Sequence, residues 1–409
     1  MRPIPRSAGR PRLGGTVPQA LFTAAMLLTA QARAAEPAPA ATPAGPLTER
    51  ARSTQQVWNG VVSAPDGRLF VVLPRLANPS GPSLAVLGAD QSLVPYPDAA
   101  WNGVASRLPG KTARPPERPE QSPGPVFVGL NAIHLAPDGA LWAVDTGLPG
   151  PGKAPVAGGA RLIRIDLGSN QVTQVLTVPA DALRPKSMID DIRFNGDHAY
   201  VTDAGAPGLL VVDLASGAMR RVLDHDPALT AQRPIVVDGE MLKGPDNKPV
   251  LIHADQLEVT PDGRHLYVQP LCGPMSRIET ALLDNPQTTP QALSAAVAFW
   301  YDTPALGGTA IAPDGTLYLN DLETDSILSL SPNRVLTRLV RDPRLHWADA
   351  PFLAADGTLL VPVPQLDRAA QFHHGHAEIQ FPVALYTLKP AALANNTAGG
   401  AAAVAPGRP

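Results

Sequence analysis

The sequence contains little cysteine, little charge and no long apolar segment beyond its N-terminus. Its single cysteine, Cys272, excludes an internal disulfide, and we expect it to be a small buried side chain. Charged residues make up 17% of the chain and the formal net charge is −3, so no basic surface is present to attract nucleic acid. Because no later segment approaches ~18 apolar residues, we expect no membrane span.

The motifs of several enzyme classes are also missing. The chain has no G-x-S-x-G elbow, H-E-x-x-H pair, P-loop or dinucleotide-binding glycine motif. A helical period is nearly absent, and only residues 180–184 and 276–284 are expected to form single helical turns. The sequence therefore gives no support for serine-hydrolase or nucleotide chemistry, and it predicts an all-β fold.

The N-terminus has the layout of an export signal. A basic start is followed by an apolar run over residues 20–30 and an Ala-x-Ala sequence at 32–34, which is typical of a secretory signal peptide. We therefore predict a signal peptide over 1–34 and a periplasmic or secreted protein, with an uncleaved anchor as the alternative. A Pro/Ala linker is expected over 35–48, and a disordered tail over 390–409.

One pattern recurs six times between residues 49 and 389. Each copy has an inner apolar segment, a tight turn that in five copies ends in Asp-Gly, and a second apolar segment. Asp-Gly favours hairpin turns because both residues tolerate a positive φ. The six turn glycines are Gly67, Gly139, Gly196, Gly263, Gly315 and Gly357.

This repeat predicts a six-bladed β-propeller with four antiparallel strands in each blade. The intervals between turns are long enough for four short strands with alternating apolar residues. The last copy is one strand short, so we expect a strand within residues 49–57 to complete that blade and close the ring. An array of β-sandwiches is the alternative fold.

The repeat register brings polar side chains to one mouth of the central channel. Eight residues before the turn glycine, or at the matching position of the shorter third turn, five of six copies carry Asn or Asp. These are Asn59, Asn131, Asp190, Asp255 and Asp349, which we call the mouth residues. The fifth copy has Gly307 there, and Asp191 follows Asp190. Three copies also carry an Asp at the end of the second strand: Asp145, Asp203 and Asp321.

Converging oxygen ligands suit a hard divalent cation such as Ca²⁺, and Asn59, Asn131, Asp190 and Asp255 are the candidate metal ligands. The same oxygens could bind the amine or hydroxyl groups of a small ligand. Close carboxylates raise one another's pKa, which favours a cationic partner. The alternative is structural, since Asn and Asp at strand ends often cap turns.

Aromatic and histidine residues give weaker signals. Trp58 and Trp347 adjoin the mouth register and are expected either to pack or to touch a ligand. The tract His373-His374-x-His376 resembles a metal-binding sequence but is expected in an exposed loop.

Four segments in order resemble the major royal jelly/yellow protein family. They are WNGVVSAPDGRLFVVLPR with the following LVPYPDAAWN, then LAPDGALWAVDTG, then the stretch 187–225, and finally LHWADAPFLAADGTLLVPVPQL. The resemblance covers roughly residues 57–388. It implies a secreted six-bladed propeller that binds small ligands in or near its channel; some insect relatives are associated with dopachrome conversion and others bind biogenic amines.

Two departures limit what the resemblance implies. With one cysteine the chain lacks the disulfides of the insect members, and it carries a Pro-rich insertion at 108–125. Dopachrome conversion is therefore not expected. The mouth also resembles gluconolactonase-type propellers, which hold a divalent cation with Glu, Asn and Asp, although Asn59 stands where an acidic ligand is expected.

Three functional hypotheses follow from these observations. The first is an exported small-molecule binder with its ligand at the channel mouth. The second is a divalent-metal-dependent lactonase or esterase-like hydrolase, with Asp191 as the candidate general base. The third is an interaction scaffold that uses the 108–125 loop. The sequence indicates no particular oligomeric state.

Overall fold

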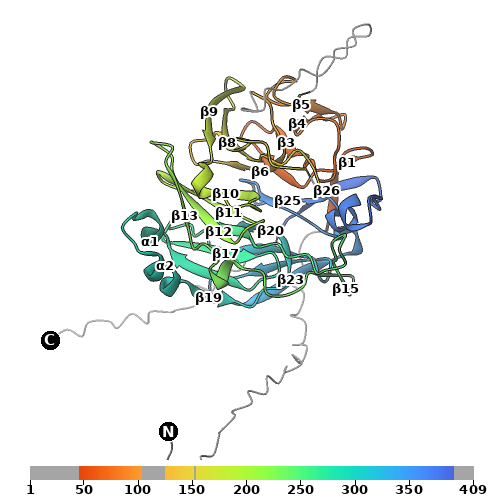
Figure 1. Cartoon of the computed structure of the whole chain (residues 1–409). Helices are drawn as coiled ribbons and strands as arrows, with labels where there is room; N and C mark the ends of the chain where they lie inside the picture. The colour runs from red at the N-terminus through yellow and green to blue at the C-terminus, as the bar shows by residue number, and fades with distance from the viewer. Residues whose placement is uncertain (1–45, 104–124, 152, 391–409) are drawn as a thin grey trace, which may run out of the picture. The chain divides into compact units, whose positions relative to one another are not determined.

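The computed structural model describes residues 46–103, 125–151 and 153–390. Within these ranges the chain forms six four-stranded antiparallel sheets and a separate two-stranded hairpin (Figure 1). Five of the sheets use four strands in consecutive order, as the repeat predicts. The predicted all-β, six-bladed propeller is confirmed.

Each blade runs from an inner strand at the channel to an outer strand at the rim. The inner strands are β2 (Gly60–Ser63), β6 (Leu130–Leu135), β10 (Ile189–Asn195), β16 (Ala254–Val259), β20 (Leu306–Ile311) and β24 (Phe352–Leu353). The second strands are β3 (Leu69–Val72), β7 (Leu141–Thr146), β11 (His198–Asp203), β17 (His265–Pro270), β21 (Leu317–Asp321) and β25 (Leu359–Val363). The third strands are β4 (Leu84–Leu87), β8 (Ala160–Asp166), β12 (Gly208–Asp213), β18 (Met275–Glu279), β22 (Ser326–Leu330) and β26 (Val383–Leu388). The outer strands are β5 (Leu93–Pro95), β9 (Gln171–Thr177), β13 (Met219–Val222), β19 (Ala298–Tyr301), β23 (Leu336–Arg341) and β1 (Thr48–Ser53).

The N-terminal strand closes the ring. β1 pairs antiparallel with β26, from Thr48 opposite Thr387 to Ser53 opposite Val383, and it supplies the outer strand of the sixth blade. The inner strands contact one another in order around the channel, and β24 of the last blade contacts β2 of the first. The predicted closure by a strand within 49–57 is confirmed, with the observed strand starting one residue earlier.

The six turn glycines all adopt the positive φ that their positions require, from +57° at Gly196 to +85° at Gly67 and Gly315. The preceding aspartates do not share this conformation, in contrast to the sequence-based expectation. They instead accept a hydrogen bond from the amide two residues later, as Asp66 does from Arg68 at 3.0 Å. The five Asp-Gly turns therefore use glycine for the backbone conformation and aspartate for a hydrogen bond, whereas the third turn has Asn195 before its glycine.

The core lies between adjacent blades. Phe70 of β3 packs with Leu141, Ile163 and Ile165 of the second blade, and all four side chains are fully buried. Burying one such side chain contributes roughly 1.5–3 kcal/mol. Each blade thus covers its neighbour's sheet face, which explains why the alternating strands hold together without disulfides. Cys272 is buried, as expected.

Short helices and one hairpin lie outside the blades. The helices are η1 (Ala180–Ala182), η2 (Pro227–Leu229), α1 (Thr280–Asp284), α2 (Pro290–Ala296), η3 (Pro343–Leu345), η4 (Leu366–Arg368) and η5 (Ala370–Phe372). The hairpin pairs β14 (Val236–Val237) with β15 (Glu240–Met241). The helical turn expected at 180–184 corresponds to η1. Of the turn expected at 276–284, only the second half is helical, as α1, because residues 276–279 belong to β18. The expected turns did not include α2, whose signals are Pro290 in its first turn and the Thr289 hydroxyl, which accepts from the Ala292 amide at 3.2 Å.

Several predicted segments lie outside the described residues. They are the signal peptide at 1–34, all but the end of the 35–48 linker, nearly all of the 108–125 insertion, and the tail after residue 390. Within the described ranges, no helix has the length and apolar character needed to cross a membrane.

Candidate functional site

Irregular strand pairing positions most of the mouth residues. The ladder between the inner and second strands is interrupted at Asn131, at Asp190 and Asp191, and at Asp255 and Gln256, each time at the same level of the blade. A bulge of this kind turns side chains away from the regular alternation. Successive polar residues in one strand can therefore face the same channel mouth.

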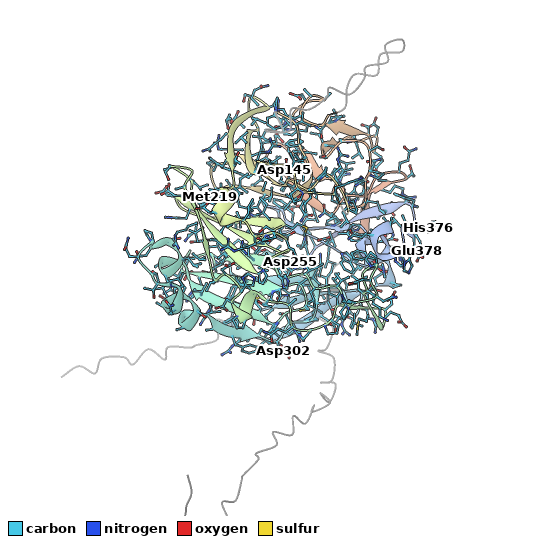
Figure 2. The ribbon with its side chains drawn as sticks, viewed as in Figure 1. Asp145, Met219, Asp255, Asp302, His376 and Glu378 are labelled. Atoms are coloured by element: carbon cyan, nitrogen blue, oxygen red, sulfur yellow. The ribbon has the colours of Figure 1, made fainter. Side chains whose placement is uncertain are left out.

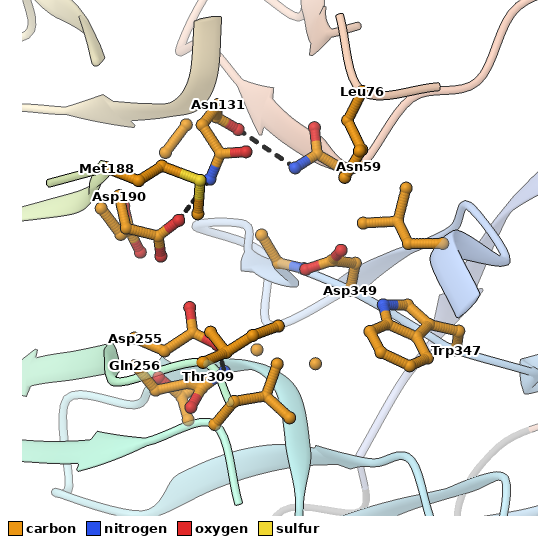
Figure 3. A pocket seen from close by; sticks show the side chains of 18 residues that line it. Asn59, Leu76, Asn131, Met188, Asp190, Asp255, Gln256, Thr309, Trp347 and Asp349 are labelled. Carbon is orange, nitrogen blue, oxygen red and sulfur yellow. Dashed lines mark hydrogen bonds between the residues drawn. The ribbon is translucent and has the colours of Figure 1, made fainter. Parts of the chain in front are cut away.

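The mouth residues line a single cavity of about 100 Å³ (Figure 3). All five of them lie on its wall, together with Asp191. The fifth blade contributes Gly307, where a Cβ atom would lie 2.0 Å from the carbonyl oxygen of Ala348. The structure thus brings together the predicted ring and gives a steric reason for its one gap.

Hydrogen bonds link neighbouring mouth residues around part of the ring. The Asn59 side-chain amide donates to the Asn131 carbonyl at 3.1 Å, and the Asn131 side chain donates to Asp190 Oδ1 at 2.5 Å. The Asn59 Oδ1 atom is buried and accepts no hydrogen bond. A buried acceptor without a donor is costly, so this atom calls for a cation or an N–H or O–H group.

Three carboxyl groups of the mouth have raised pKa values. Burial raises the pKa of Asp190 well above its ordinary value, and the facing Asp255 adds to the effect. Burial, with repulsion from Asp349 and Asp191, raises the pKa of Asp255 to about 7, although its hydrogen bond with Asp190 acts in the opposite direction. Burial also raises the pKa of Asp349 well above its usual range, with Asp190 and Asp191 contributing. The site therefore favours protons, or another cation in their place.

Apolar side chains surround these oxygens, and most of them lie outside the repeat register that marks the mouth residues. They come from loops before or after the strands and are Leu76, Met188, Ile252, Leu271, Trp347 and Leu366. Of the two tryptophans near the mouth register, only Trp347 lines the cavity. Trp58 is fully buried and its indole N–H donates to the Ala384 carbonyl at 3.2 Å, so it serves packing.

A charged layer separates this cavity from a second one. Arg193 donates to Asp191 at 2.6 Å and to both oxygens of Glu258, at 2.9 and 3.1 Å. Arg193 and Glu258 also line a cavity of about 350 Å³ nearer the turn end of the channel, beside His134. Arg193 and Glu258 each lie three residues after a mouth residue, Asp190 and Asp255. This shared position in the repeat is the sequence feature from which the ion pair could have been predicted.

The contacts of Asp191 bear on its candidate role as a general base. One of its oxygens accepts from Arg193 and the other from the Ile192 amide at 2.7 Å. Both oxygens of this carboxylate thus already accept hydrogen bonds from the chain itself, one of them from a guanidinium. These contacts favour a structural role in holding Arg193.

The aspartates that end the second strands do not line the cavity. Asp145 accepts from the amides of Val128 and Gly129, both at 2.9 Å, and pairs with Arg161 at 2.7 Å. Asp203 has the same arrangement with the Met188 amide at 2.9 Å and with Arg221 at 2.8 Å. The carboxylates of Asp145 and Asp203 thus bind the backbone amides of the segment that leads into the inner strand of their own blade.

Asp321 is likewise occupied within its own loop. It accepts from the Glu323 amide at 2.9 Å and from the Thr324 hydroxyl. The expectation that Asp145, Asp203 and Asp321 share the ligand site with the mouth residues is therefore corrected. They form a structural feature of the blades.

The histidine tract lies away from the channel. In Figure 2, Asp255 lies near the middle of the ribbon, whereas His376 and Glu378 lie at its edge. His374 and His376 are exposed, and His373 Nε2 contacts the Asp367 carbonyl at 2.9 Å. The expected exposed loop is observed, and the tract takes no part in the mouth.

Comparison with protein families gives one match. The model described as "Major royal jelly protein" matches residues 132–343, which is just over half of the chain. The match begins one residue after Asn131 and includes Asp190 and Asp255. A search of curated proteins gives no matching relative.

Solved structures with similar architecture have low sequence identity to this chain. They include virginiamycin B lyase from Staphylococcus aureus, at 11% identity over 84% of this chain and 99% of that chain, with a TM-score of 0.46. A gluconolactonase from Xanthomonas campestris has 12% identity over 87% and 99%, with a TM-score of 0.48. Aldose sugar dehydrogenase from Streptomyces coelicolor, in its PQQ-bound form, has 14% identity over 86% and 99%, with a TM-score of 0.46. Identities this low say nothing about the activity of this chain.

Proposed function

The chain belongs to the major royal jelly protein family, and from this premise we propose that it binds a small molecule with a cationic head group, such as a protonated amine, at the channel mouth. The observation that carries the proposal is the convergence of three carboxyl groups on one cavity: Asp190 and Asp349, which are buried, and Asp255, which is half-buried. A bound cation would allow these groups to ionise and would offset their mutual repulsion. An N–H donor would also satisfy Asn59 Oδ1, which has no partner.

The size of the cavity indicates that it holds only the head group of a ligand, while the rest of the ligand lies against the apolar wall. About 100 Å³ is enough for a head group or a few waters, whereas whole ligand sites usually measure roughly 300–1,000 Å³. Trp347, Met188 and Leu76 lie on the same wall and offer apolar contact to the remainder of the ligand. An aromatic or aliphatic primary amine has this combination of a charged head and an apolar body.

The N-terminal sequence supports a location outside the cytoplasm for this function. A basic segment, an apolar run and an Ala-x-Ala sequence precede the propeller, and we propose that residues 1–34 direct export to the periplasm or the exterior. Mass spectrometry of the protein recovered outside the cytoplasm tests this point. A mature chain starting at residue 35 is expected, and a chain that keeps residues 1–34 would contradict it.

A divalent-metal-dependent lactonase or esterase-like hydrolase is the second candidate. The same oxygens favour it: Asn59, Asn131, Asp190 and Asp255 would hold a cation such as Ca²⁺, which would polarise a substrate carbonyl. One observation weighs against it: Asp191, the candidate general base, is already paired with Arg193.

Calorimetry with matched probes separates the two candidates. We expect 2-phenylethylamine to bind with one-to-one stoichiometry and 2-phenylethanol, its neutral analogue, to bind far more weakly. Asp190→Asn and Asp255→Asn should each abolish amine binding. Asp321→Asn is the matched control, because this buried aspartate also has a burial-raised pKa but lies outside the cavity.

Other outcomes of the same titrations would reject the amine proposal. Equal binding of the amine and the alcohol would show that the carboxyl groups do not select charge. Stoichiometric Ca²⁺ binding that both mouth variants abolish, together with lactone hydrolysis lost on chelation, would favour the hydrolase.

A further inference from the structure

A second group of titratable side chains lies outside the channel mouth, where four loops meet. Asp238 lies in the turn between β14 and β15, Asp325 between β21 and β22, His346 just after η3, and Asp367 in η4. The ligand atoms of Asp238, Asp325 and His346 all lie within 4.8 Å of one another. Among the described residues this is the group with the spacing of a metal site.

The imidazole of His346 is held in the orientation of a metal ligand. Its Nε2 atom lies 2.8 Å from Asp367 Oδ2 in a hydrogen bond, and its side chain is only 8% exposed. When a histidine binds a metal through one ring nitrogen, the other usually donates to a carboxylate in this way. The bond to Asp367 leaves Nδ1 as the nitrogen with a free lone pair.

The free nitrogen faces the other two carboxylates. His346 Nδ1 lies 3.3 Å from Asp238 Oδ2 and 3.9 Å from Asp325 Oδ1, and neither contact has hydrogen-bond geometry. The Asp325 Oδ1 atom is buried and accepts no hydrogen bond. A buried carboxylate oxygen without a donor, directed at a lone-pair nitrogen, is costly unless a cation lies between them.

We propose that Asp238, Asp325 and His346 bind a divalent transition-metal ion of the Zn²⁺ class, with Asp367 as the positioning residue that orients the imidazole. One nitrogen and two carboxylate oxygens suit Zn²⁺, whereas Ca²⁺ prefers six to eight oxygens. Asp238 is 62% exposed, so the ion would have a path to solvent and room for a water ligand. This site does not depend on the function proposed for the channel mouth.

Binding at this site would tie separate loops together beside the mouth. Trp347 directly follows His346, Leu366 directly precedes Asp367, and both line the mouth cavity. An ion held by Asp238, Asp325 and His346 would link the β14–β15 hairpin to that wall. The site would then support the rigidity of the apolar part of the ligand pocket.

Titration of the purified, metal-free protein with Zn²⁺ tests the proposal. We expect one Zn²⁺ per chain, a rise in melting temperature, and much weaker binding of Ca²⁺. His346→Gln should remove saturable binding, and Asp367→Asn should weaken it about 10- to 100-fold. Asp238→Asn changes an exposed position and should weaken binding without loss of the fold.

Three controls make the result specific to this site. A variant with His374 and His376 both changed to Ala should bind Zn²⁺ normally, and so should Asp255→Asn. His198→Gln is the matched histidine control, since His198 also lies beside an aspartate, with Nδ1 3.9 Å from Asp284 Oδ1. Binding that survives in His346→Gln, or that is lost in the double-histidine or Asp255→Asn variant, would overturn the proposal. Absence of Zn²⁺ binding in the unmodified protein would overturn it as well.

Discussion

Arg193 and Glu258 form a two-point ion pair between the third and fourth blades, with N–O distances of 2.9 and 3.1 Å. Both residues are buried, and Arg193 also bonds Asp191. Burial disfavours the charge of Arg193, but Asp191 and Glu258 outweigh this effect and raise the pKa of the guanidinium. The pair occupies equivalent positions of two repeats and lines the second cavity, and Asp191, which pairs with Arg193, lines the mouth cavity.

Loss of Arg193 should be costly because it leaves the carboxylates of Asp191 and Glu258 without their counter-charge. We expect Arg193→Met to lower the free energy of unfolding by about 3–5 kcal/mol, as measured by urea denaturation. The double variant Arg193→Met/Glu258→Gln should recover part of this loss, because one of the stranded charges is removed. Equal stability of the single and double variants would show that the pair is not coupled.

The stability of the ligand-free protein should fall as the pH rises from about 5 to 8. The pKa of Asp255 is raised to about 7, and those of Asp190 and Asp349 are also raised. Across this range the folded chain binds more protons than the unfolded chain, so the free energy of unfolding decreases with increasing pH. Urea midpoints at pH 5 and 8 measure the change. Asp255→Asn should flatten the profile, and an unchanged slope in this variant would contradict the assignment.

Binding of a cationic ligand should show the opposite pH dependence. An amine requires ionised carboxylates, so its affinity should increase as the pH passes through the pKa of Asp255, about 7. Each proton released on binding gives up to about a tenfold change in affinity per pH unit. Calorimetry in buffers of different ionisation enthalpy measures the protons released. Affinity that is constant from pH 5 to 8 would contradict a carboxylate-based site.

Ring closure by β1 should contribute strongly to stability. Deletion up to Ser53 removes the outer partner of β26 and leaves an unpaired sheet edge that can pair with another chain. We expect a large drop in melting temperature and concentration-dependent association, measured by light scattering. Deletion only up to residue 45 keeps all of β1 and should leave both properties unchanged. A monomeric, equally stable protein without β1 would show that closure is dispensable.

The sequence predicted those parts of the fold and site that follow the repeat. Six turn glycines fixed the blade register, and this register placed Asn59, Asn131, Asp190, Asp255 and Asp349 on one cavity. It also suggested Asp145 and Asp203, because residues at equivalent strand ends look alike in sequence. Only their contacts with Arg161 and Arg221 distinguish a structural aspartate from one at the mouth.

Features that depend on loops could not be predicted in this way. The apolar wall of the mouth includes Met188 and Trp347, and the proposed metal ligands Asp238, Asp325 and His346 come from three separate loops. These residues share no repeat register, so their proximity is set by loop paths that the hydrophobic pattern does not encode. The bulges at Asp190 and Asp255 could not be predicted either. A bulge is a one-residue shift in register between two paired strands, so it is not visible in the sequence of one strand alone.

Asp145 and Asp255 should respond to neutralisation with opposite changes in stability. Asp145→Asn weakens the pairing with Arg161 and the acceptance of two backbone amides, so the free energy of unfolding should fall by about 2–4 kcal/mol. Asp255→Asn removes a half-buried charge from a repulsive cluster, so at pH 8 the ligand-free protein should become more stable while amine binding is lost. Urea denaturation and calorimetry on the two variants measure both properties. Destabilisation by both substitutions would mean that Asp255 serves the fold as Asp145 does, and a stabilised Asp255→Asn variant that still binds amine would separate the cluster from the ligand site.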